Sequence, residues 1–416
     1  MTAPQNNALK KSLVIGGGVV GLNIALQLQA QGFQVTLCDS GHKESASYGN
    51  AGHIATEQVE PLASMATVRS AWRRWFMRGG ALSLPPQGIS AWLPFSLRMI
   101  FAAQPARFAR GKAALGGLIS EAMPAWRRRM TDIGAPDLLR EDGHFVVWET
   151  PESAARGLKS WSSADTGMTT LRPVTDAEMA QLSALTKRKI HGAIRFIGTA
   201  QIADTRRMLE TLDERFVERG GRYLLERVEK MIIRKSSAWA VLTGGEQLTA
   251  DTVVMAAGIG SKTLLESLGE TVPMIAERGY HIQTPDHNWP KGFPPVVFED
   301  RSMIVTGFEN GLRAASFVEF NRQDAAPDPR KWARLRKHVG DLGLPFEGEG
   351  AEWIGTRPTL PDYLPAIGRS ARVENLYYAF GHQHLGLTLG AVTGEIVANM
   401  IKSGEAPDAF SLSRFK

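Results

Sequence analysis

A glycine cluster near the N-terminus constrains the fold of this chain more than any other feature. The apolar run Ser12–Ile15 leads into Gly16–Gly21, Gly-Gly-Gly-Val-Val-Gly, which fits the pattern G-x-G-x-x-G. Apolar residues then recur at helical spacing as far as Gly32, a residue type that often ends a helix. A second strand is predicted at Gln34–Cys38, with Asp39 at its end. Together these parts predict a Rossmann-type nucleotide-binding unit.

Each part of this unit has a physical role in binding a dinucleotide. Gly16 permits the tight turn, Gly18 lets the backbone approach a pyrophosphate, and Gly21 allows the helix to pack closely on the strand. The helix N-terminus offers free N–H groups to the phosphates. The Asp39 carboxylate can bind ribose hydroxyls, which disfavours NADP but leaves NAD and FAD open. The alternative is a glycine turn without a nucleotide. The cofactor contacts predicted here are Gly16, Gly18, Val19, Val20, Asp39 and Ser40.

Composition narrows the class of protein further. With 416 residues, 43% hydrophobic and 22% charged, the chain suits two domains of a soluble globular protein. Cys38 is the single cysteine, so an internal disulfide is excluded. The segment Met1–Lys11 lacks the apolar core of a signal peptide, and no run of about 18 apolar residues predicts a spanning helix. We therefore expect a cytoplasmic protein. No nucleic-acid recognition module is recognisable, so the net charge of +6 does not predict nucleic-acid binding.

Four further stretches resemble one known family. They are Ser45–His53, with Ser-Tyr-Gly-Asn-Ala-Gly-His at its end, Asp251–Ser261, Trp353–Asp362 and Gly381–Val397. Their order and spacing resemble the FAD-dependent D-amino-acid oxidase and dehydrogenase superfamily, most closely its bacterial D-amino-acid dehydrogenases and hydroxy-D-proline dehydrogenases. Taken singly, the first two are also compatible with a solvated turn and with a plain strand–turn–helix. The resemblance runs from Lys11 to Ile401 and is loose between Ala63 and Gln201.

The resemblance implies an α/β plus α+β fold of the glutathione-reductase-like, D-amino-acid oxidase type. A Rossmann-type FAD-binding domain would comprise residues 10–84, 199–271 and 351–416. A substrate domain on a mostly antiparallel sheet would comprise residues 85–198 and 272–350. The local pattern predicts a helix at Asp204–Arg219 and strands within Arg222–Ile233 and Leu248–Ala257, and again at Pro295–Phe298, Met303–Phe308 and Leu312–Phe320.

The resemblance also implies FAD as the cofactor. Family members with covalent flavin attach it through a histidine or cysteine, whereas this chain has Asn50 in the flavin loop and its one cysteine, Cys38, at the adenine end. Non-covalent FAD is therefore expected. The further contacts implied are Ser47, Asn50, Ala51, Gly52, His53, Val228, Ala257, Gly258, Gly381, His382, Leu385, Gly386, Leu387 and Thr388.

Three residues are candidates for contact with the substrate. Arg357 matches the arginine that grips the substrate carboxylate in glycine oxidase-like members, and a bidentate guanidinium suits a carboxylate. Tyr280 would cover the substrate, or would be a core tyrosine with its hydroxyl satisfied. His384 would bind a substrate hydroxyl or the amine, or would be structural, and His53 has the same ambiguity. The histidines His382 and His384 have no third ligand nearby in sequence, so no metal is expected.

The predicted reaction is oxidation of the C–N bond of a small D-amino or imino acid to the imine. The loop motifs are most similar to those of enzymes that convert cis-4-hydroxy-D-proline to a pyrroline hydroxycarboxylate. Three alternatives stay open: a broad D-amino-acid dehydrogenase, a glycine- or sarcosine-type oxidase, and the flavin subunit of a hetero-oligomeric amino-acid or opine dehydrogenase. A flavin-binding protein without catalysis is a fourth, against which Arg357 argues.

One aromatic and arginine-rich stretch extends from Trp72 to Phe101. Such a composition suits a membrane interface, where aromatic rings and cationic heads are favoured, but an apolar helix packed on the substrate domain explains it as well. From this stretch we expect an electron carrier or membrane quinone as the acceptor. The protein would be free in the cytoplasm or peripheral on the cytoplasmic face of the inner membrane.

Overall fold

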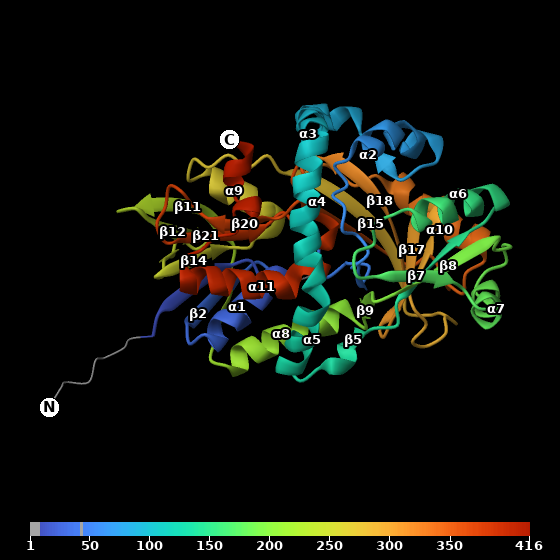
Figure 1. The fold of residues 1–416 in the computed structure, drawn as a ribbon. Helices are drawn as coiled ribbons and strands as arrows, with labels where there is room; N and C mark the ends of the chain where they lie inside the picture. Colours follow the sequence, from blue (N-terminus) through green and yellow to red (C-terminus); the bar gives the residue numbers. More distant parts are fainter. Residues whose placement is uncertain (1–8, 42–44) are drawn as a thin grey trace.

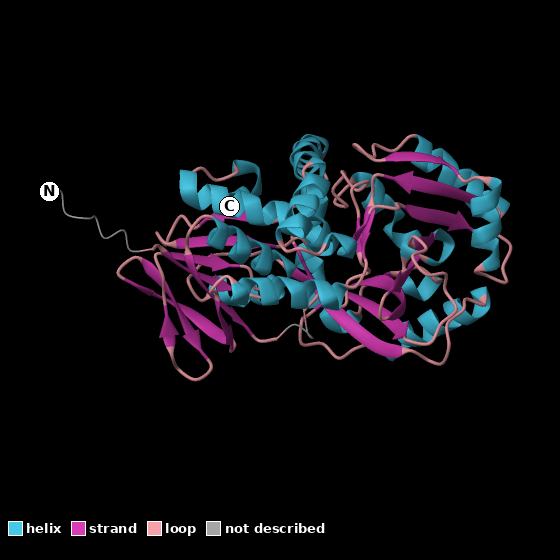
Figure 2. Ribbon diagram, turned by 90° about the horizontal axis from the view of Figure 1, so that it is seen from below, coloured by secondary structure: helices cyan, strands magenta, loops and turns pink. Residues whose placement is uncertain are grey.

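The computed structural model describes residues 9–41 and 45–416 and shows an elongated molecule with two large sheets (Figure 1). Most of the segment Met1–Lys11, interpreted above as lacking a signal peptide, lies outside the described residues. Seen from below, strands gather toward the two ends, with helices between them (Figure 2). The eleven α-helices of the described part are α1 Val19–Ala30, α2 Met65–Ser70, α3 Ile89–Ala102, α4 Pro105–Ser120, α5 Ala122–Asp132, α6 Pro151–Ser162, α7 Asp176–Ala184, α8 Thr205–Glu218, α9 Ser261–Glu266, α10 Pro329–Leu342 and α11 Gly386–Ser403.

The first sheet is the predicted Rossmann-type sheet. Its six strands follow the order β10-β2-β1-β14-β21-β20, and all neighbours are parallel except the edge pair β20 and β21. Helices α1 and α11 pack against each other beside it. The strands are β1 Lys11–Ile15, β2 Gln34–Asp39, β10 Arg222–Leu225, β14 Thr252–Met255, β20 Ala366–Arg369 and β21 Leu376–Phe380. The predicted glycine turn therefore stands at the carboxyl ends of parallel strands, where open α/β sheets bind ligands.

The second sheet is mostly antiparallel, as predicted. Its order is β19-β15-β18-β17-β16-β6-β8-β7, and β4 pairs with β18 beside this path. Only the pairs β16 with β6 and β4 with β18 are parallel. The strands are β4 Leu82–Ser83, β6 His144–Trp148, β7 Thr170–Pro173, β8 Gly192–Ile197, β15 Ile275–Thr284, β16 Val296–Phe298, β17 Met303–Phe308, β18 Gly311–Asn321 and β19 Ala351–Thr359. One small sheet contains β11 Val228–Arg234, β12 Ser237–Leu242 and β13 Gln247–Leu248. Another contains β3 His53–Ile54, β5 Leu139–Arg140 and β9 Ala200–Ile202.

Several segments pair or pack across the predicted domain boundaries, including β4, which lies within residues 10–84 and pairs with β18. Strand β19, placed by the prediction with the FAD-binding part, pairs with β15 along nine residues of the antiparallel sheet. Helices α4 and α5, placed with the substrate domain, pack instead on α11, and Trp126 of α5 donates from its indole N–H to the carbonyl oxygens of Leu387 and Thr388. These are long-range contacts, which local periodicity does not encode, and the domain division stays a prediction.

The aromatic and arginine-rich stretch follows α2 and forms short 3-10 turns at Ala71–Arg74, Phe76–Arg78 and Pro86–Gly88, strand β4 and helix α3. Helix α3 packs on the antiparallel sheet through Phe95, whose ring lies 5.2 Å from that of Phe320. Within residues 9–41 and 45–416, no helix has the length and apolar character needed to cross a membrane.

Candidate active site

The glycine turn has the backbone geometry that the motif predicts. Gly16 has a φ of +107°, and a Cβ there would lie 2.6 Å from the carbonyl carbon of Ala256. A Cβ at Gly21 would collide with the carbonyl oxygen of Gly16, so α1 can approach β1 only with glycine at this position. The carboxylate of Asp39 accepts hydrogen bonds from the backbone N–H groups of Gly17 at 2.7 Å and Gly41 at 2.6 Å. This places a carboxylate beside the turn, where a ribose would lie.

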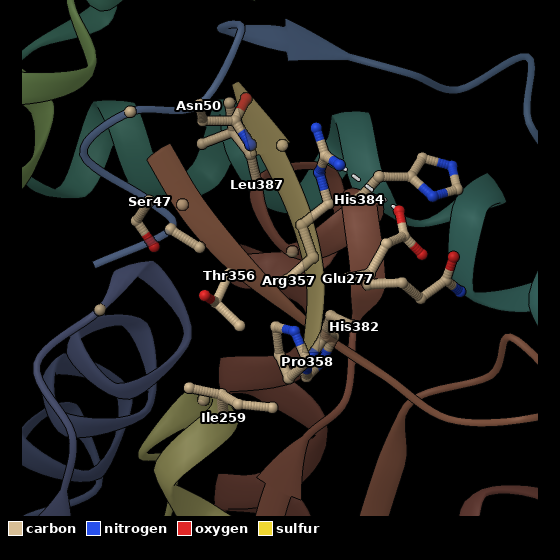
Figure 3. Close-up of a pocket in the computed structure, with 18 of the residues that line it drawn as sticks. Ser47, Asn50, Ile259, Glu277, Thr356, Arg357, Pro358, His382, His384 and Leu387 are labelled. Atoms are coloured by element: carbon tan, nitrogen blue, oxygen red, sulfur yellow. Dashed lines mark hydrogen bonds and ion pairs between the residues drawn. The ribbon is translucent and has the colours of Figure 1, made fainter. Parts of the chain in front are cut away.

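A continuous cavity of about 1380 Å³ connects this turn with the antiparallel sheet. It is lined by most of the residues singled out from the sequence. These are Gly16, Gly18, Val19, Val20, Asp39, Ser40, Ser47, Asn50, Ala51, His53, Val228, Ala257, Gly258, Tyr280, Arg357, Gly381, His382, His384, Gly386 and Leu387. Figure 3 shows Ser47, Ile259, Asn50 and Arg357 around one space, although they come from four separate segments.

Three predicted cofactor contacts do not line the cavity, and the structure gives each a packing role. Gly52 has a φ of +78°, and a Cβ there would lie 2.7 Å from Cζ of Phe308. Leu385 is buried in the core beneath α11. The Thr388 hydroxyl accepts a hydrogen bond from the backbone N–H of Ala55 at 2.9 Å and so holds the chain that follows the flavin loop. Direct contact of these three residues with the cofactor stays a prediction.

Arg357 lies on β19 directly opposite Glu277 on β15. Its Nη1 is 3.4 Å from Glu277 Oε1 and donates to the carbonyl oxygen of Phe317 at 3.2 Å. The other carboxylate oxygen of Glu277 accepts hydrogen bonds from Thr359 Oγ1 at 3.0 Å and Tyr363 Oη at 3.1 Å. Glu277 is buried, whereas the Arg357 side chain is 27% exposed toward the cavity. The pair thus fixes the guanidinium while leaving donors for a ligand.

Unusual backbone conformations gather around this pair. Phe317, Tyr363 and Gln383 have φ values of +71°, +56° and +49°, although none is a glycine, and all three line the cavity. The Nε2 of Gln383 donates to the carbonyl oxygen of Tyr363. Left-handed conformations of residues other than glycine cost of order 1–3 kcal/mol each and are concentrated at functional sites. Their presence around Arg357 supports this end of the cavity as a binding site.

The two predicted histidines of the C-terminal loop have different surroundings. His384 Nε2 is hydrogen-bonded to Oε1 of Gln58, and burial together with the positive charge of Arg357 lowers its pKa to about 3. His382 Nε2 contacts Thr393 Oγ1 at 3.0 Å, and burial lowers its pKa to about 3 as well. Both rings are therefore neutral at pH 7. His384 lies near Arg357 in Figure 3, whereas the imidazole of His382 bonds to α11.

Tyr280 borders the cavity, and its hydroxyl is hydrogen-bonded within the protein. Its hydroxyl donates to Glu319 Oε2 at 3.0 Å and accepts from Arg278 Nη2 at 2.9 Å, and its ring packs edge-on against Trp332 of α10. Neighbouring residues of a strand point to opposite faces, so Tyr280 faces away from Glu277 and Arg357. Burial raises the pKa of Tyr280 to about 12. The structure thus favours the core alternative for this residue.

A second polar cluster on the cavity wall escaped the sequence analysis. His53 Nε2 lies 3.1 Å from Glu57 Oε1, and His144 of β6 packs edge-on against the His53 ring. Although burial opposes it, the charge and hydrogen bond of His53 lower the pKa of Glu57 to about 2. One potential ligand atom from each of the three residues lies within 4.8 Å of the others, a spacing that a metal ion could use. The expected absence of a metal therefore stays a prediction.

Sequence reasoning missed Glu277, Glu57 and Gln58. Glu277 stands three residues before Tyr280 in an apolar strand, and only the pairing of β15 with β19 brings it to Arg357. Glu57 follows His53 at a spacing of four residues, a signal that was available but is common by chance. Gln58 meets His384 across 326 positions of sequence, so no local pattern points to it.

The cavity fits a flavin dinucleotide. Val19, at the start of α1, donates its backbone N–H to Ser47 Oγ at 3.1 Å, which ties the flavin loop to the phosphate end. A Cβ at Gly18 would come within 3.3 Å of this same oxygen, so glycine keeps the approach open. From this turn the cavity wall continues through Asn50 and Gly258 to Arg357, so the cavity is long enough for both halves of a flavin dinucleotide.

The chain belongs to the family of FAD-dependent oxidoreductases. The family model described as DAO, FAD dependent oxidoreductase, matches residues 11–400. FAD is accordingly the cofactor of this class of enzyme.

Relatives match over nearly the full length. The chain is 28% identical to a protein named D-amino-acid oxidase from Bradyrhizobium diazoefficiens, covering 97% of this chain and 98% of the relative. It is 26% identical to a D-amino acid dehydrogenase from Vibrio vulnificus, covering 98% and 99%. Among solved structures, glycine oxidase from Geobacillus kaustophilus has the same fold, with a TM-score of 0.70, 18% identity and 98% of both chains covered.

Proposed function

We propose that the protein oxidises the C–N bond of a small D-amino or imino acid to the imine. The observation that carries this proposal is the Arg357 guanidinium, held by buried Glu277 at the end of the FAD cavity with donors facing the open space. A zwitterion offers a carboxylate as its strongest handle, and a guanidinium binds it through two parallel hydrogen bonds. The relatives named D-amino-acid oxidase and D-amino acid dehydrogenase support the same substrate class.

Positioning is the main contribution of the protein to such a reaction. The Cα–H and N–H bonds break, a C=N bond forms, and the substrate loses two electrons and two protons. Bound FAD supplies the chemistry by accepting a hydride. Arg357 anchors the carboxylate, and neutral His384, paired with Gln58, can hydrogen-bond a second polar group of the substrate. A neutral imidazole beside Arg357 adds no further positive charge near the substrate amine.

The substrate that we propose is cis-4-hydroxy-D-proline, with a pyrroline hydroxycarboxylate as product. Its ring hydroxyl gives the His384–Gln58 pair a partner that an unsubstituted amino acid lacks. A broad D-amino-acid dehydrogenase is the second candidate, favoured by the Vibrio vulnificus relative. We further propose that electrons leave to a carrier or a membrane quinone rather than to oxygen, and that the protein works at the cytoplasmic face of the inner membrane.

Anaerobic bleaching of the bound flavin tests the reaction directly. Hydroxy-D-proline, a panel of D-amino acids, glycine and sarcosine would be mixed with the oxidised protein, and absorbance near the flavin maximum followed. Hydroxy-D-proline should bleach the flavin fastest, and each L-isomer should leave it oxidised. Bleaching by several D-amino acids at equal rates would favour the broad dehydrogenase, and no bleaching by any amine would refute the proposed function. Peroxide formation in air at the rate seen with a dye acceptor would refute the acceptor.

A further inference from the structure

Exposed apolar side chains are concentrated in one short part of the chain. Of the 17 large hydrophobic residues that are exposed among the described residues, ten lie between Leu62 and Phe101. Figure 1 shows α2 and α3, which belong to this segment, along one edge of the molecule. We call the following set the apolar–basic face: Trp72, Trp75, Met77, Ile89, Leu93, Leu97, Ile100 and Phe101, with the exposed arginines Arg73, Arg78, Arg98, Arg107 and Arg110.

Helix α3 is apolar on both of its sides. Its inner side packs on the antiparallel sheet through buried Phe95. Its outer side presents Leu93 and Leu97 one turn apart, 43% and 60% exposed, where a water-facing helix would carry polar residues. Contiguous exposed apolar surface of this kind marks a contact with a membrane or another molecule.

The charged side chains of this segment and of the adjoining helix α4 are all basic. Residues 61–120 contain seven arginines and one lysine and no aspartate or glutamate. The whole chain has 48 basic and 42 acidic residues, so outside this segment 40 basic residues stand against the same 42 acidic ones. The net positive charge of the protein therefore lies where its apolar surface lies. An anionic lipid surface complements both properties, because its charged headgroups attract the arginines and its acyl boundary accommodates the apolar side chains.

The arginines are arranged around the aromatic rings of the face. The guanidinium carbons of Arg73 and Arg78 lie 5.2 and 5.3 Å from the ring centre of Trp72, and that of Arg107 lies 4.0 Å from the Phe101 ring. Aromatic rings with cationic heads beside them are favoured at the level of lipid headgroups. Helix α3 has 14 residues, fewer than the roughly 20 that a spanning helix needs. It is suited to lie in the interface plane.

We propose that the apolar–basic face docks the protein on an anionic lipid bilayer, with the outer side of α3 in the headgroup region. The proposal rests on the proposed function only for its consequence at the active site. Leu62, Thr67 and Ala71 line the cavity, as does Met99 of α3, so the docked segment is also one wall of that cavity. A lipid-dissolved quinone would reach the cavity from this side. There it would accept the two electrons and two protons removed from the amino acid and become a quinol.

Vesicle sedimentation of the FAD-loaded full chain tests the docking. The probes are vesicles of phosphatidylcholine alone and vesicles with one third phosphatidylglycerol. The protein should sediment with the anionic vesicles, at least tenfold less with the neutral ones, and less as salt is raised. The double variant Leu93→Ser, Leu97→Ser should bind anionic vesicles at least tenfold more weakly. Turnover with an added lipid-soluble quinone in these vesicles should fall by a similar factor.

A matched control replaces exposed apolar residues elsewhere, Leu158→Ser on α6 and Val217→Ser on α8, and should bind vesicles as the parent does. Both double variants should keep the parent's amine turnover with a water-soluble dye. Equal sedimentation of parent and α3 variant would overturn the docking. The docking would also be overturned if the parent bound no vesicles but formed a dimer in light scattering, and the α3 variant did not form that dimer. The face would then contact a second copy of the chain. Absence of dye-coupled turnover in the parent would instead refute the proposed function and leave the sedimentation result standing.

Discussion

At the scale of single residues, the site depends on how Glu277 holds Arg357 without occupying all of its hydrogen-bond donors. The contact between them is 3.4 Å long, whereas the second oxygen of Glu277 is tied closely to Thr359 and Tyr363. A buried carboxylate that is so hydrogen-bonded stays in place when a ligand arrives. The guanidinium can therefore turn its remaining donors toward a substrate carboxylate.

Arg357→Ala should lower kcat/KM for the preferred amino acid by about 30-fold to several thousand-fold. The loss corresponds to roughly 2–5 kcal/mol, the usual cost of removing one partner of a desolvated charge pair. Flavin content should stay unchanged. Arg357→Lys keeps the positive charge but loses the two parallel donors of the guanidinium, so its kcat/KM should lie between those of the parent and Arg357→Ala. Steady-state kinetics with a dye acceptor measures this. Activity of Arg357→Ala within about threefold of the parent would remove Arg357 as the carboxylate anchor.

The residues near the flavin loop also predict how FAD is attached. Burial raises the pKa of the Cys38 thiol to about 12, so no thiolate is available for a bond to the ring, and the loop carries Asn50. Acid precipitation should therefore release all the flavin into the supernatant as intact FAD, identified by chromatography and mass. Yellow colour in the washed pellet would contradict non-covalent binding.

At the scale of elements, the spacing of β15 and β19 depends on a residue without a side chain. Gly279 pairs with Gly355 across the two strands, and a Cβ at Gly279 would lie 2.6 Å from Cζ of Arg357. The bulge between Arg278 and Tyr280 adds local irregularity to the same strand. Bulges often lie beside active sites, where they re-aim side chains. The strand is thus shaped around the guanidinium.

Gly279→Ala should displace the Arg357 guanidinium and raise KM for the amino acid at least tenfold, with a smaller change in kcat and normal FAD content. The reason is steric, since the φ of Gly279 does not need glycine. The matched control is Gly340→Ala in α10, where an added Cβ meets nothing within 4 Å. That variant should match the parent in activity. Equal KM values for the two variants would show that the contact is relieved without moving Arg357.

At the scale of the whole molecule, buried neutral histidines make stability depend on pH. Burial lowers the pKa of His144 to about 3, as it does for His382 and His384. In the unfolded chain a histidine has a pKa of about 6.5. Between these values the unfolded state binds more protons, so stability is full above about pH 6.5 and declines as the pH falls toward 3.

His144→Asn should make that decline shallower by about 1.4 kcal/mol per pH unit, the contribution of one proton. His53 and Glu57 face the ring of His144, so the variant Glu57→Gln would be measured alongside His144→Asn. Urea unfolding of the FAD-loaded protein between pH 6 and 4.5 gives the slopes. Exposed His191→Asn is the control and should keep the parental slope. Identical slopes for His144→Asn and the parent would mean that His144 is charged in the folded protein.

The sequence by itself determined the parts of this protein that are contiguous along the chain. The glycine turn, α1 and the strands on either side of it were predictable because every residue involved lies within about 30 positions, and helical and strand periodicities are local. The same holds for β17, found at the predicted residues. Arg357 was expected at the site through a resemblance to a known family, and the structure places it on the cavity wall.

Only the tertiary structure decided which distant segments meet. Strand pairing brings Glu277 to Arg357, and packing brings Gln58 to His384. Hydrogen bonds from Arg278 and to Glu319 hold the Tyr280 hydroxyl. Helices α4 and α5 joined the nucleotide-binding layer because their apolar sides fit α11. Such contacts are selected by the total apolar surface that the whole chain can bury. A short window of sequence does not reveal how much apolar surface the whole chain can bury.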